Sequence, residues 1–298
     1  MTENINIKDT KVPIIYPCDC HVHVIGPQKK YPFEATRSYT PVDATANDLV
    51  KMMDKLGLRR AVVVQPSIFG QDNRCTIDAI HKIEAFGLQA RAVAVLEHPV
   101  PLSEIDSMHR SGVRGLRVNL KSKIGQSLEE ARAKLLNASR LCERNGWHVQ
   151  LFVDRSLISA LLPEIQQLPV DLVLDHFGGL KPNGPCDPDG KTIMSLLESG
   201  RIWIKLSGNY RVAPSAFDSK IPVLAKDLAS RNPDRLIWAS DWPHTPEHSG
   251  EAIIDPPVKA YREIDTNRLL HWVYDWFDNS TVTKILQDNP AKLYDFSS

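Results

Sequence analysis

The chain carries Asp19-Cys20-His21-Val22-His23 within its first apolar run, residues 14–24. An apolar run of this kind predicts a buried strand. Side chains alternate along a strand, so we expect the aspartate and both histidines on one face, and Cys20 and Val22 on the other. Isolated His-x-His pairs also arise by chance, so this pair indicates a site only if partners converge on it from elsewhere in the chain.

Short apolar runs then alternate with stretches of helical period along the chain. Strands are predicted over residues 14–24, 60–65, 90–96, 113–118, 148–153, 171–176, 201–207 and 235–241. Helices are expected between them, with a break at Pro163, and again in residues 245–298. Eight such units without a linker predict one α/β domain over residues 1–298, a (β/α)8 barrel of TIM type with C-terminal helices, in which residues 1–12 form a loose N-terminal arm. An open doubly wound sheet is the alternative, but no glycine-rich phosphate loop follows any strand.

The composition excludes several classes of function. The chain has 36 basic and 36 acidic residues and no net charge, so we expect no nucleic-acid partner. Residues 1–11 lack the apolar core of a signal peptide, and no run approaches 18 apolar residues, so we expect a cytoplasmic protein without a membrane partner. Five scattered cysteines fit a reducing compartment, with Cys18 and Cys20 buried and facing away from the histidines. The apolar stripe in residues 269–277 indicates either core or a contact in a homo-oligomer.

Polar and titratable residues gather where the predicted strands end. In a barrel of this kind those ends converge on one cavity, which holds the active site. The set comprises His21, His23, Ser67, Arg117, Asn119, Asp175, His176, Ser207, Arg211, Asp241 and His244. Structural roles stay open for some of the acids: Asp175 can orient His176, Asp19 can support the strand-one pair, and Asp72-Asn73 can cap the second helix.

Seven motifs in order along the chain resemble the amidohydrolase superfamily. Within it, they resemble the branch of 2-pyrone-4,6-dicarboxylate lactonase, sulfomuconolactone hydrolases and sugar-lactone enzymes. The motifs are Asp19-Cys-His-Val-His23, Ser67 with Asp72-Asn73, Gly112-Val-Arg-Gly-Leu-Arg-Val-Asn119, Leu174-Asp-His176, Ile204-Lys-Leu-Ser207, Ile237-Trp-Ala-Ser-Asp-Trp-Pro-His244 and Asn289-Pro-Ala-Lys-Leu-Tyr294.

The resemblance implies a role for each matched residue. Asp241 would be the general base that takes a proton from the attacking water. His21, His23 and His176 would either bind a metal or act on the substrate carbonyl without one. The substrate's carbonyl and carboxylates would be held by Tyr39, Ser67, Arg117, Lys123, Arg211 and His244. Two departures from the pyrone lactonase, Phe152 for a tyrosine and Lys123 for an arginine, suggest a related but different substrate.

The resulting hypothesis is a hydrolase that opens a small anionic lactone, carboxylated or sulfonated, in the catabolism of aromatic compounds or sugar acids. Opening a lactone needs water activated by a base and donors for the oxyanion, and no cofactor is required. The alternative is a mononuclear Zn²⁺ hydrolase or decarboxylase with His21, His23, His176 and Asp241 as ligands. A two-metal centre is disfavoured because strands four and five end in Arg117 and Phe152 rather than in ligands. A non-catalytic binding protein is the third hypothesis, disfavoured because binding alone needs no general base.

Overall fold

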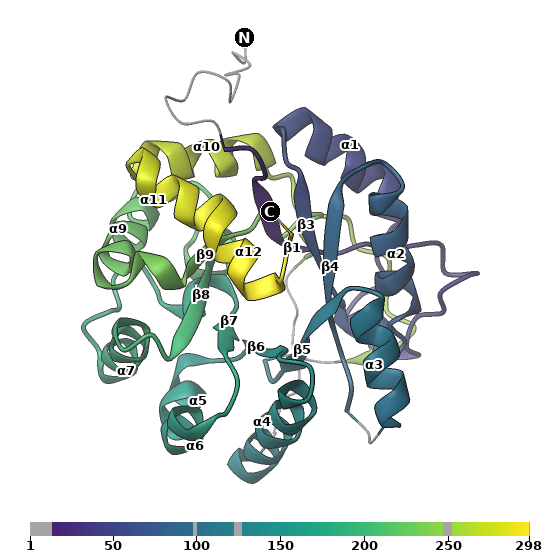
Figure 1. Ribbon diagram of the computed structural model, residues 1–298, viewed down its shortest axis with the longest axis horizontal. Helices are drawn as coiled ribbons and strands as arrows, with labels where there is room; N and C mark the ends of the chain where they lie inside the picture. Colours follow the sequence, from purple (N-terminus) through teal and green to yellow (C-terminus); the bar gives the residue numbers. More distant parts are fainter. Residues whose placement is uncertain (1–13, 98–99, 122–126, 247–251, 298) are drawn as a thin grey trace.

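Eight parallel strands form a barrel in the computed structural model, which describes residues 14–97, 100–121, 127–246 and 252–297 (Figure 1). They pair in the order β1-β3-β4-β5-β6-β7-β8-β9. Their bounds are β1 Cys18–Val22, β3 Arg60–Val64, β4 Gln89–Ala94, β5 Val113–Asn119, β6 His148–Phe152, β7 Leu172–Leu174, β8 Ile202–Leu206 and β9 Leu236–Trp238. The backbone N–H of Asp241 donates to the carbonyl of His21 (3.0 Å), and that of His23 to the carbonyl of Trp242 (2.8 Å). These bonds join the end of β9 to β1, so the predicted (β/α)8 barrel is confirmed.

Helices surround the barrel, as Figure 1 shows. They are α1 Ala46–Leu56, α2 Arg74–Glu84, α3 Leu102–Arg110, α4 Leu128–Glu143, α5 Arg155–Ala160, α6 Leu162–Gln167, α7 Pro188–Glu198, α8 Asn209–Val212, α9 Ile221–Arg231, α10 Thr266–Trp276, α11 Asn279–Thr283 and α12 Asn289–Tyr294. Local sequence explains the ends of α1, because Thr45 and Asp48 form a capping box and Gly57 takes the left-handed conformation after the last turn. The predicted break at Pro163 is confirmed, since α5 ends before it and α6 begins beside it. Within the described ranges, no helix has both the length and the apolar character needed to cross a bilayer.

The first strand departs from the predicted alternation. Its register against β3 shifts between Asp19 and Val22, so one extra residue of β1 is accommodated there as a bulge. Cys20 packs inside the barrel with Val62 and Trp203, whereas Val22 joins the larger cluster under the helices. The expectations that Cys20 and Val22 share a face, and that Cys18 and Cys20 turn away from the barrel interior where His21 lies, are therefore wrong. Periodicity could not show a bulge, because both cysteines are buried either way.

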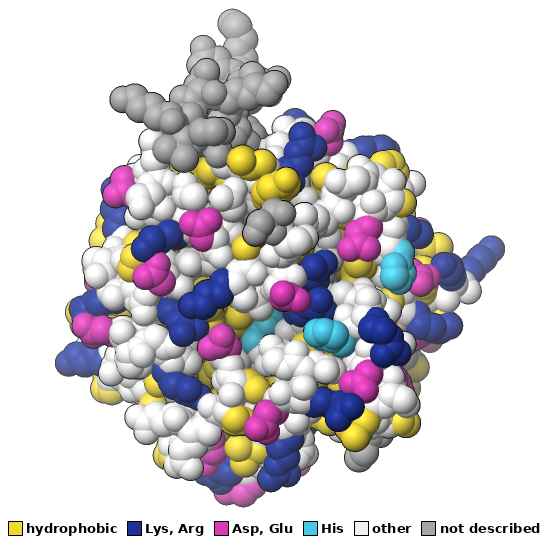
Figure 2. All heavy atoms as spheres, viewed as in Figure 1, with side chains coloured by type: hydrophobic (Ala, Val, Ile, Leu, Met, Phe, Trp, Pro, Cys, Tyr) yellow, Lys and Arg dark blue, Asp and Glu magenta, His cyan; other side chains and the backbone are white. Residues whose placement is uncertain are grey.

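The C-terminal segment closes the end of the barrel where the strands begin. Tyr294 and Phe296 are buried and pack on the interior cluster with Cys18 and Cys20. The guanidinium of Arg60, at the start of β3, lies 5.2 Å from the Phe296 ring centroid. In Figure 1 α12 and the C-terminus lie across this mouth, and Figure 2 shows basic and acidic side chains intermixed on the same face. The catalytic candidates lie at the opposite end of the strands.

Candidate active site

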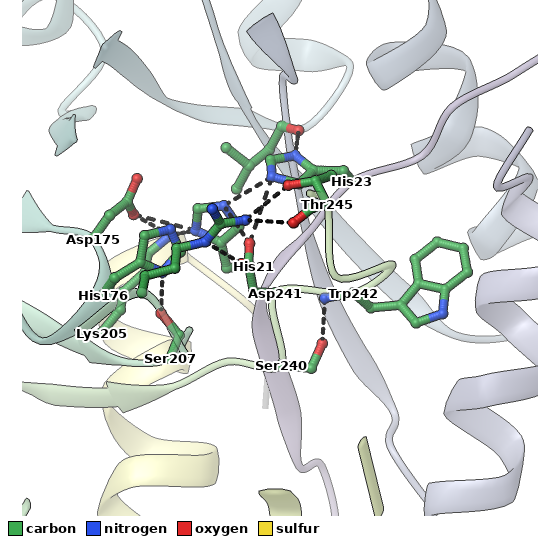
Figure 3. Close-up of polar contacts among 12 residues, drawn as sticks. His21, His23, Asp175, His176, Lys205, Ser207, Ser240, Asp241, Trp242 and Thr245 are labelled. Carbon is green, nitrogen blue, oxygen red and sulfur yellow. Dashed lines mark hydrogen bonds and ion pairs between the residues drawn. The ribbon is translucent and has the colours of Figure 1, made fainter. Parts of the chain in front are cut away.

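The join between β9 and β1 brings the predicted base to the histidine pair (Figure 3). The Nε2 atoms of His21 and His23 lie 3.2 Å apart, and each is 3.7 Å from Oδ1 of Asp241. Asp241 has φ +66°, a left-handed conformation that turns the chain out of the strand. His176 follows β7, and its ring centroid lies 5.1 Å from that of His21. All four residues are buried, so the structure brings the four predicted catalytic residues together.

The two oxygens of Asp241 have different surroundings. Oδ2 accepts hydrogen bonds from Nε of Arg211 (2.7 Å) and from the hydroxyl of Tyr210 (2.8 Å). Oδ1 is buried, faces the imidazoles and has no hydrogen-bond partner among the residues described. Burial raises the pKa of Asp241, but the Arg211 guanidinium and the nearby imidazoles outweigh it and hold the pKa well below its ordinary value. Asp241 is therefore a carboxylate with one oxygen available.

Two of the imidazoles are oriented by hydrogen bonds to the Nδ1 atom, which points away from the site. Nδ1 of His23 lies 2.7 Å from the carbonyl of Val64, and Nδ1 of His176 lies 3.0 Å from the Ser207 hydroxyl. Burial lowers the pKa of both His23 and His176 to about 4, and lowers that of His21 well below its ordinary value. The three rings are thus neutral at pH 7. His23 donates through Nδ1 to the Val64 carbonyl, so it can only accept through Nε2, whereas His21 and His176 can each donate or accept through the nitrogen that faces the site.

A second set of polar groups lies beneath His21 inside the barrel. Nζ of Lys205 donates to the Gln150 side-chain oxygen (2.7 Å) and the Cys20 carbonyl (2.9 Å), and lies 3.3 Å from Nδ1 of His21. Oδ1 of Asp175 lies 3.2 Å from the same Nδ1 and 3.7 Å from Nζ of Lys205. Burial lowers the pKa of Lys205 to about 8, although Asp175 opposes the shift. Asp175, which follows β7, therefore pairs with His21 of β1 and Lys205 of β8, while Ser207 rather than Asp175 contacts His176.

Two cavities open beside this cluster. One, of about 400 Å³, is lined by Lys121, Phe152, Asp175, His176 and Arg211 among others. The other, of about 320 Å³, is lined by Ser67 and Arg117 among others. The Arg117 guanidinium lies 3.4 Å from Asp175 and 5.6 Å from the Phe152 ring centroid, so it stands between the two. Nε of Arg117 is buried and has no hydrogen-bond partner in the described part of the chain.

The other predicted substrate contacts lie in different places. Tyr39 is buried beside Thr245, and burial raises the pKa of its hydroxyl. His244 is buried, with Nδ1 3.3 Å from the Tyr210 hydroxyl and Nε2 2.8 Å from that of Thr266. Lys123 and residues 1–12 lie outside the described residues.

Sequence reasoning missed part of the site and mistook some supporting roles. Tyr210 and Lys205 were not predicted to take part, although a lysine inside an apolar strand is a signal that could have been used. Asn73 does not cap α2, since its side chain bonds the backbone of Val95, but Oδ1 of Asp72 accepts from the backbone N–H of Arg74, the first residue of α2. Asp19 supports the site as predicted, because its Oδ1 accepts from the backbone N–H groups of His21 and Ser240.

The distances between the ligand atoms of this cluster suit a metal ion, but the protonation of the His21 ring does not. Ligand atoms of His21, His176 and Asp241 lie within 4.8 Å of one another, and the fourth predicted ligand, His23, stands outside that group. The unpartnered Oδ1 of Asp241 would suit a cation. However, Nδ1 of His21 lies 3.3 Å from the Lys205 ammonium, which can only donate, and a neutral ring that accepts this bond has its proton on Nε2. A ligating nitrogen must be bare, so the hydrogen bonds as found do not present His21 to a metal.

Comparison with known proteins identifies the family. A family model described as amidohydrolase matches residues 18–296. A 4-sulfomuconolactone hydrolase of Hydrogenophaga intermedia is 35% identical over 279 residues, covering 93% of this chain and 88% of that protein. A 2-pyrone-4,6-dicarboxylate hydrolase of Comamonas testosteroni is 29% identical over 290 residues, covering 93% and 89%. The crystal structure of a probable 2-pyrone-4,6-dicarboxylic acid hydrolase from Acinetobacter baumannii, with citric acid bound, has a TM-score of 0.77 and 27% identity over 94% of this chain and 99% of that one. The resemblance found in the motifs is thus confirmed, and this chain belongs to the amidohydrolase family.

Proposed function

We propose that this protein is a lactonase that hydrolyses a small anionic lactone, with Asp241 as general base. One observation carries the proposal: Oδ1 of Asp241 is buried, unpartnered among the described residues, and 3.7 Å from two imidazole nitrogens. This arrangement puts a base and hydrogen-bonding groups around one point, which acyl transfer to water requires. The relatives named above, hydrolases of sulfomuconolactone and of pyrone dicarboxylate, support the same chemistry.

The reaction follows from the chain's own residues. Oδ1 of Asp241 takes a proton from a water molecule, and the water oxygen bonds to the lactone carbonyl carbon. Negative charge then develops on the carbonyl oxygen, where N–H groups of the neutral His21 and His176 rings stabilise it. The ring C–O bond breaks as the intermediate collapses, and the proton held by Asp241 goes to the departing ring oxygen. The products are a carboxylic acid and a hydroxyl group on one open chain.

The anionic character of the substrate is part of the proposal. Arg117 has a buried Nε with no hydrogen-bond partner in the described ranges, so it can donate to a substrate carboxylate or sulfonate. Lys121, whose ammonium lies 5.7 Å from the Phe152 ring centroid, lines the larger cavity with Arg211. Because the chain has no net charge, attraction of an anion has to come from such local groups.

The test is turnover of matched lactones. We expect wild-type protein to hydrolyse carboxylated or sulfonated five- and six-membered lactones and to prefer them to neutral lactones of equal ring size. Arg117→Met should lower kcat/KM for the anionic substrate by roughly 10–100-fold, since a hydrogen bond to a charged group contributes about 1.5–3 kcal/mol. Equal rates on neutral and anionic lactones would refute the anionic assignment, and no turnover of any lactone would refute the proposal itself.

Metal independence is tested on the same samples. We propose that no metal is required, because neutral imidazole N–H groups can supply the donors that a metal would replace. Activity should survive exhaustive chelation, with at most one metal per chain by elemental analysis. Activity that vanishes with the chelator and returns with Zn²⁺ would favour the alternative, a mononuclear Zn²⁺ hydrolase or decarboxylase.

A further inference from the structure

Lys205 is a fully buried cation that the reaction above does not use. It is the last residue but one of β8, between Ile204 and Leu206, and its side chain points into the barrel toward His21 (Figure 3). Burying an ammonium costs several kcal/mol unless its protons are all bonded. Lys205 has three acceptors within reach, namely the Cys20 carbonyl, the Gln150 side-chain oxygen and Nδ1 of His21. An ammonium has three protons, so this set of acceptors satisfies it.

The hydrogen bonds fix the protons of the histidine pair in turn. The Val64 carbonyl can only accept, so the neutral His23 ring has its proton on Nδ1 and a bare Nε2. A bare Nε2 needs a donor, and the nitrogen 3.2 Å away is Nε2 of His21. The Lys205 ammonium can only donate, so Nδ1 of His21 is the acceptor. The Val64 carbonyl at one end of this run of hydrogen bonds and the Lys205 ammonium at the other therefore both require a proton on Nε2 of His21.

Asp175 offers the competing arrangement. Its Oδ1 lies 3.2 Å from Nδ1 of His21, close enough to accept a proton bonded to that nitrogen. If the ring proton moved to Nδ1, it would face this carboxylate, and Nε2 would become bare. A histidine bonded through its far nitrogen to a carboxylate is the usual state of a metal ligand. The Lys205 ammonium, 3.7 Å from the same Oδ1, opposes that state by occupying Nδ1.

We propose that Lys205 is a positioning residue that holds neutral His21 in its Nε2–H tautomer, so that His21 is a hydrogen-bond donor in the site and not a metal ligand. The Nε2–H that faces His23 in the free protein is then available to the carbonyl oxygen of a bound lactone. Without Lys205, Asp175 is the nearest partner for Nδ1 of His21. The ring proton then moves to Nδ1, and the bare Nε2 can bind a metal. Lys205 thereby sets which of two chemistries the same histidines support.

Two measurements test the proposal without relying on turnover. Long-range ¹H–¹⁵N spectra of protein labelled at histidine show which ring nitrogen is protonated, with His21 assigned by the signals lost in His21→Gln. In the wild type we expect the proton on Nε2, and in Lys205→Met on Nδ1. Zinc affinity, measured by competition with a chromophoric chelator and Zn²⁺ alone, should rise by about 10-fold or more in Lys205→Met, the size of effect expected from a carboxylate behind a ligating histidine.

Trp203→Phe is the matched control. Trp203 lies two residues earlier on β8, is buried in the same interior cluster, and has an indole nitrogen without a hydrogen-bond partner in the part of the chain described. Its replacement disturbs packing but no proton on His21, so tautomer and zinc affinity should match the wild type. A wild-type His21 protonated on Nδ1, or on both nitrogens, would overturn the proposal even if Lys205→Met failed to fold. So would a folded Lys205→Met with unchanged tautomer and unchanged zinc affinity.

Discussion

The two oxygens of the Asp241 carboxylate have different roles. Arg211 and Tyr210 bond Oδ2, which fixes the rotation of the group and leaves Oδ1 toward the histidines. A carboxylate held in this way cannot turn its bonded oxygen to the water. Orientation is therefore as important as charge, and two different substitutions separate the two contributions.

Asp241→Asn removes the base and keeps the shape of the side chain. An amide cannot take a proton from water, so we expect kcat to fall by a factor on the order of 10²–10⁴. Steady-state kinetics on the best lactone would measure this, and circular dichroism would confirm the fold. A folded variant that keeps most of its kcat would exclude Asp241 as the base.

Tyr210→Phe removes one of the two donors and leaves the charge. Loss of a hydrogen bond to a carboxylate costs about 1.5–3 kcal/mol, so kcat should fall by roughly 10–100-fold while KM changes little. Tyr274→Phe is the control, because the Tyr274 hydroxyl is buried without a hydrogen-bond partner among the described residues. If the two variants behave alike, Tyr210 does not orient Asp241.

The motifs identified the residues whose titratable side chains can be recognised directly in the sequence. Histidines and an aspartate at predicted strand ends were found because the fold class brings such ends together. Tyr210 was missed because only its neighbour Arg211 was assigned a role in this loop. The contact of Tyr210 with Asp241 depends on the turn of α8, which the sequence does not show. Residue type predicts which groups can react, whereas the partners that orient them depend on backbone geometry.

Loops after the strands position these groups through tight backbone conformations. Predicted strands at 171–176 and 235–241 are shorter in the structure, Leu172–Leu174 and Leu236–Trp238. His176 and Asp241 have φ of 49° and 66°, which no strand residue adopts. The apolar runs end where these strands end, and the predictions carried them on to the titratable residues that follow. Periodicity thus predicted the strands and missed the turns that position His176 and Asp241.

Gly208 shows how close such a turn lies to the site. It precedes α8 with φ +56°, and a Cβ on it would lie 2.6 Å from Nδ1 of His176. Gly208→Ala should therefore displace His176 from Ser207 and lower kcat by about 10-fold or more, since small misplacements of catalytic groups cost up to about 10² in rate.

Gly87→Ala is the matched control for this substitution. Gly87 has φ +75°, and a Cβ on it would meet no atom within 4 Å, so its replacement has the same backbone cost, about 1–2 kcal/mol, without touching the site. Thermal melts should show both variants destabilised, and kinetics should show a loss in Gly208→Ala alone. Equal activity in the two variants would mean that the approach to His176 has no catalytic effect.

The two ends of the barrel have different roles, one in packing and the other in catalysis. Tyr294 and Phe296 close the end where the strands begin, and the site occupies the other end. Eight apolar runs alternating with helices predicted a parallel sheet covered by helices, and the absence of a glycine-rich phosphate loop favoured the barrel over an open doubly wound sheet. The apolar stripe of residues 269–277 proved to be core, since Leu269, Val273 and Trp276 are buried in the larger cluster. The closure by Tyr294 and Phe296 could not be predicted, because two aromatic residues do not show which surface they cover.

Buried imidazoles make the stability of the whole chain depend on pH. Burial lowers the pKa of the five histidines that are buried in the described residues: His23, His176 and His244 to about 4, His148 to about 3, and His21 well below its ordinary value. Between pH 6.5 and about 4, each such ring is neutral in the folded protein and protonated in the unfolded chain, so the unfolded state binds more protons. The free energy of unfolding then falls as the pH falls, by up to about 1.4 kcal/mol per pH unit for each ring.

One carboxyl acts in the opposite direction. Burial raises the pKa of Asp19 to about 6, so between pH 6 and 3.8 it holds a proton in the folded state that the unfolded chain has lost, which offsets one imidazole. The imidazoles outnumber it, and we expect the melting temperature to fall steeply from pH 7 to 4.5. His148→Leu removes one buried ring that lies away from Asp241, against Tyr294, and should flatten that slope. A melting temperature that stays constant over this range would contradict the neutral imidazoles proposed for the site. A slope unchanged in His148→Leu would show that His148 itself does not contribute to it.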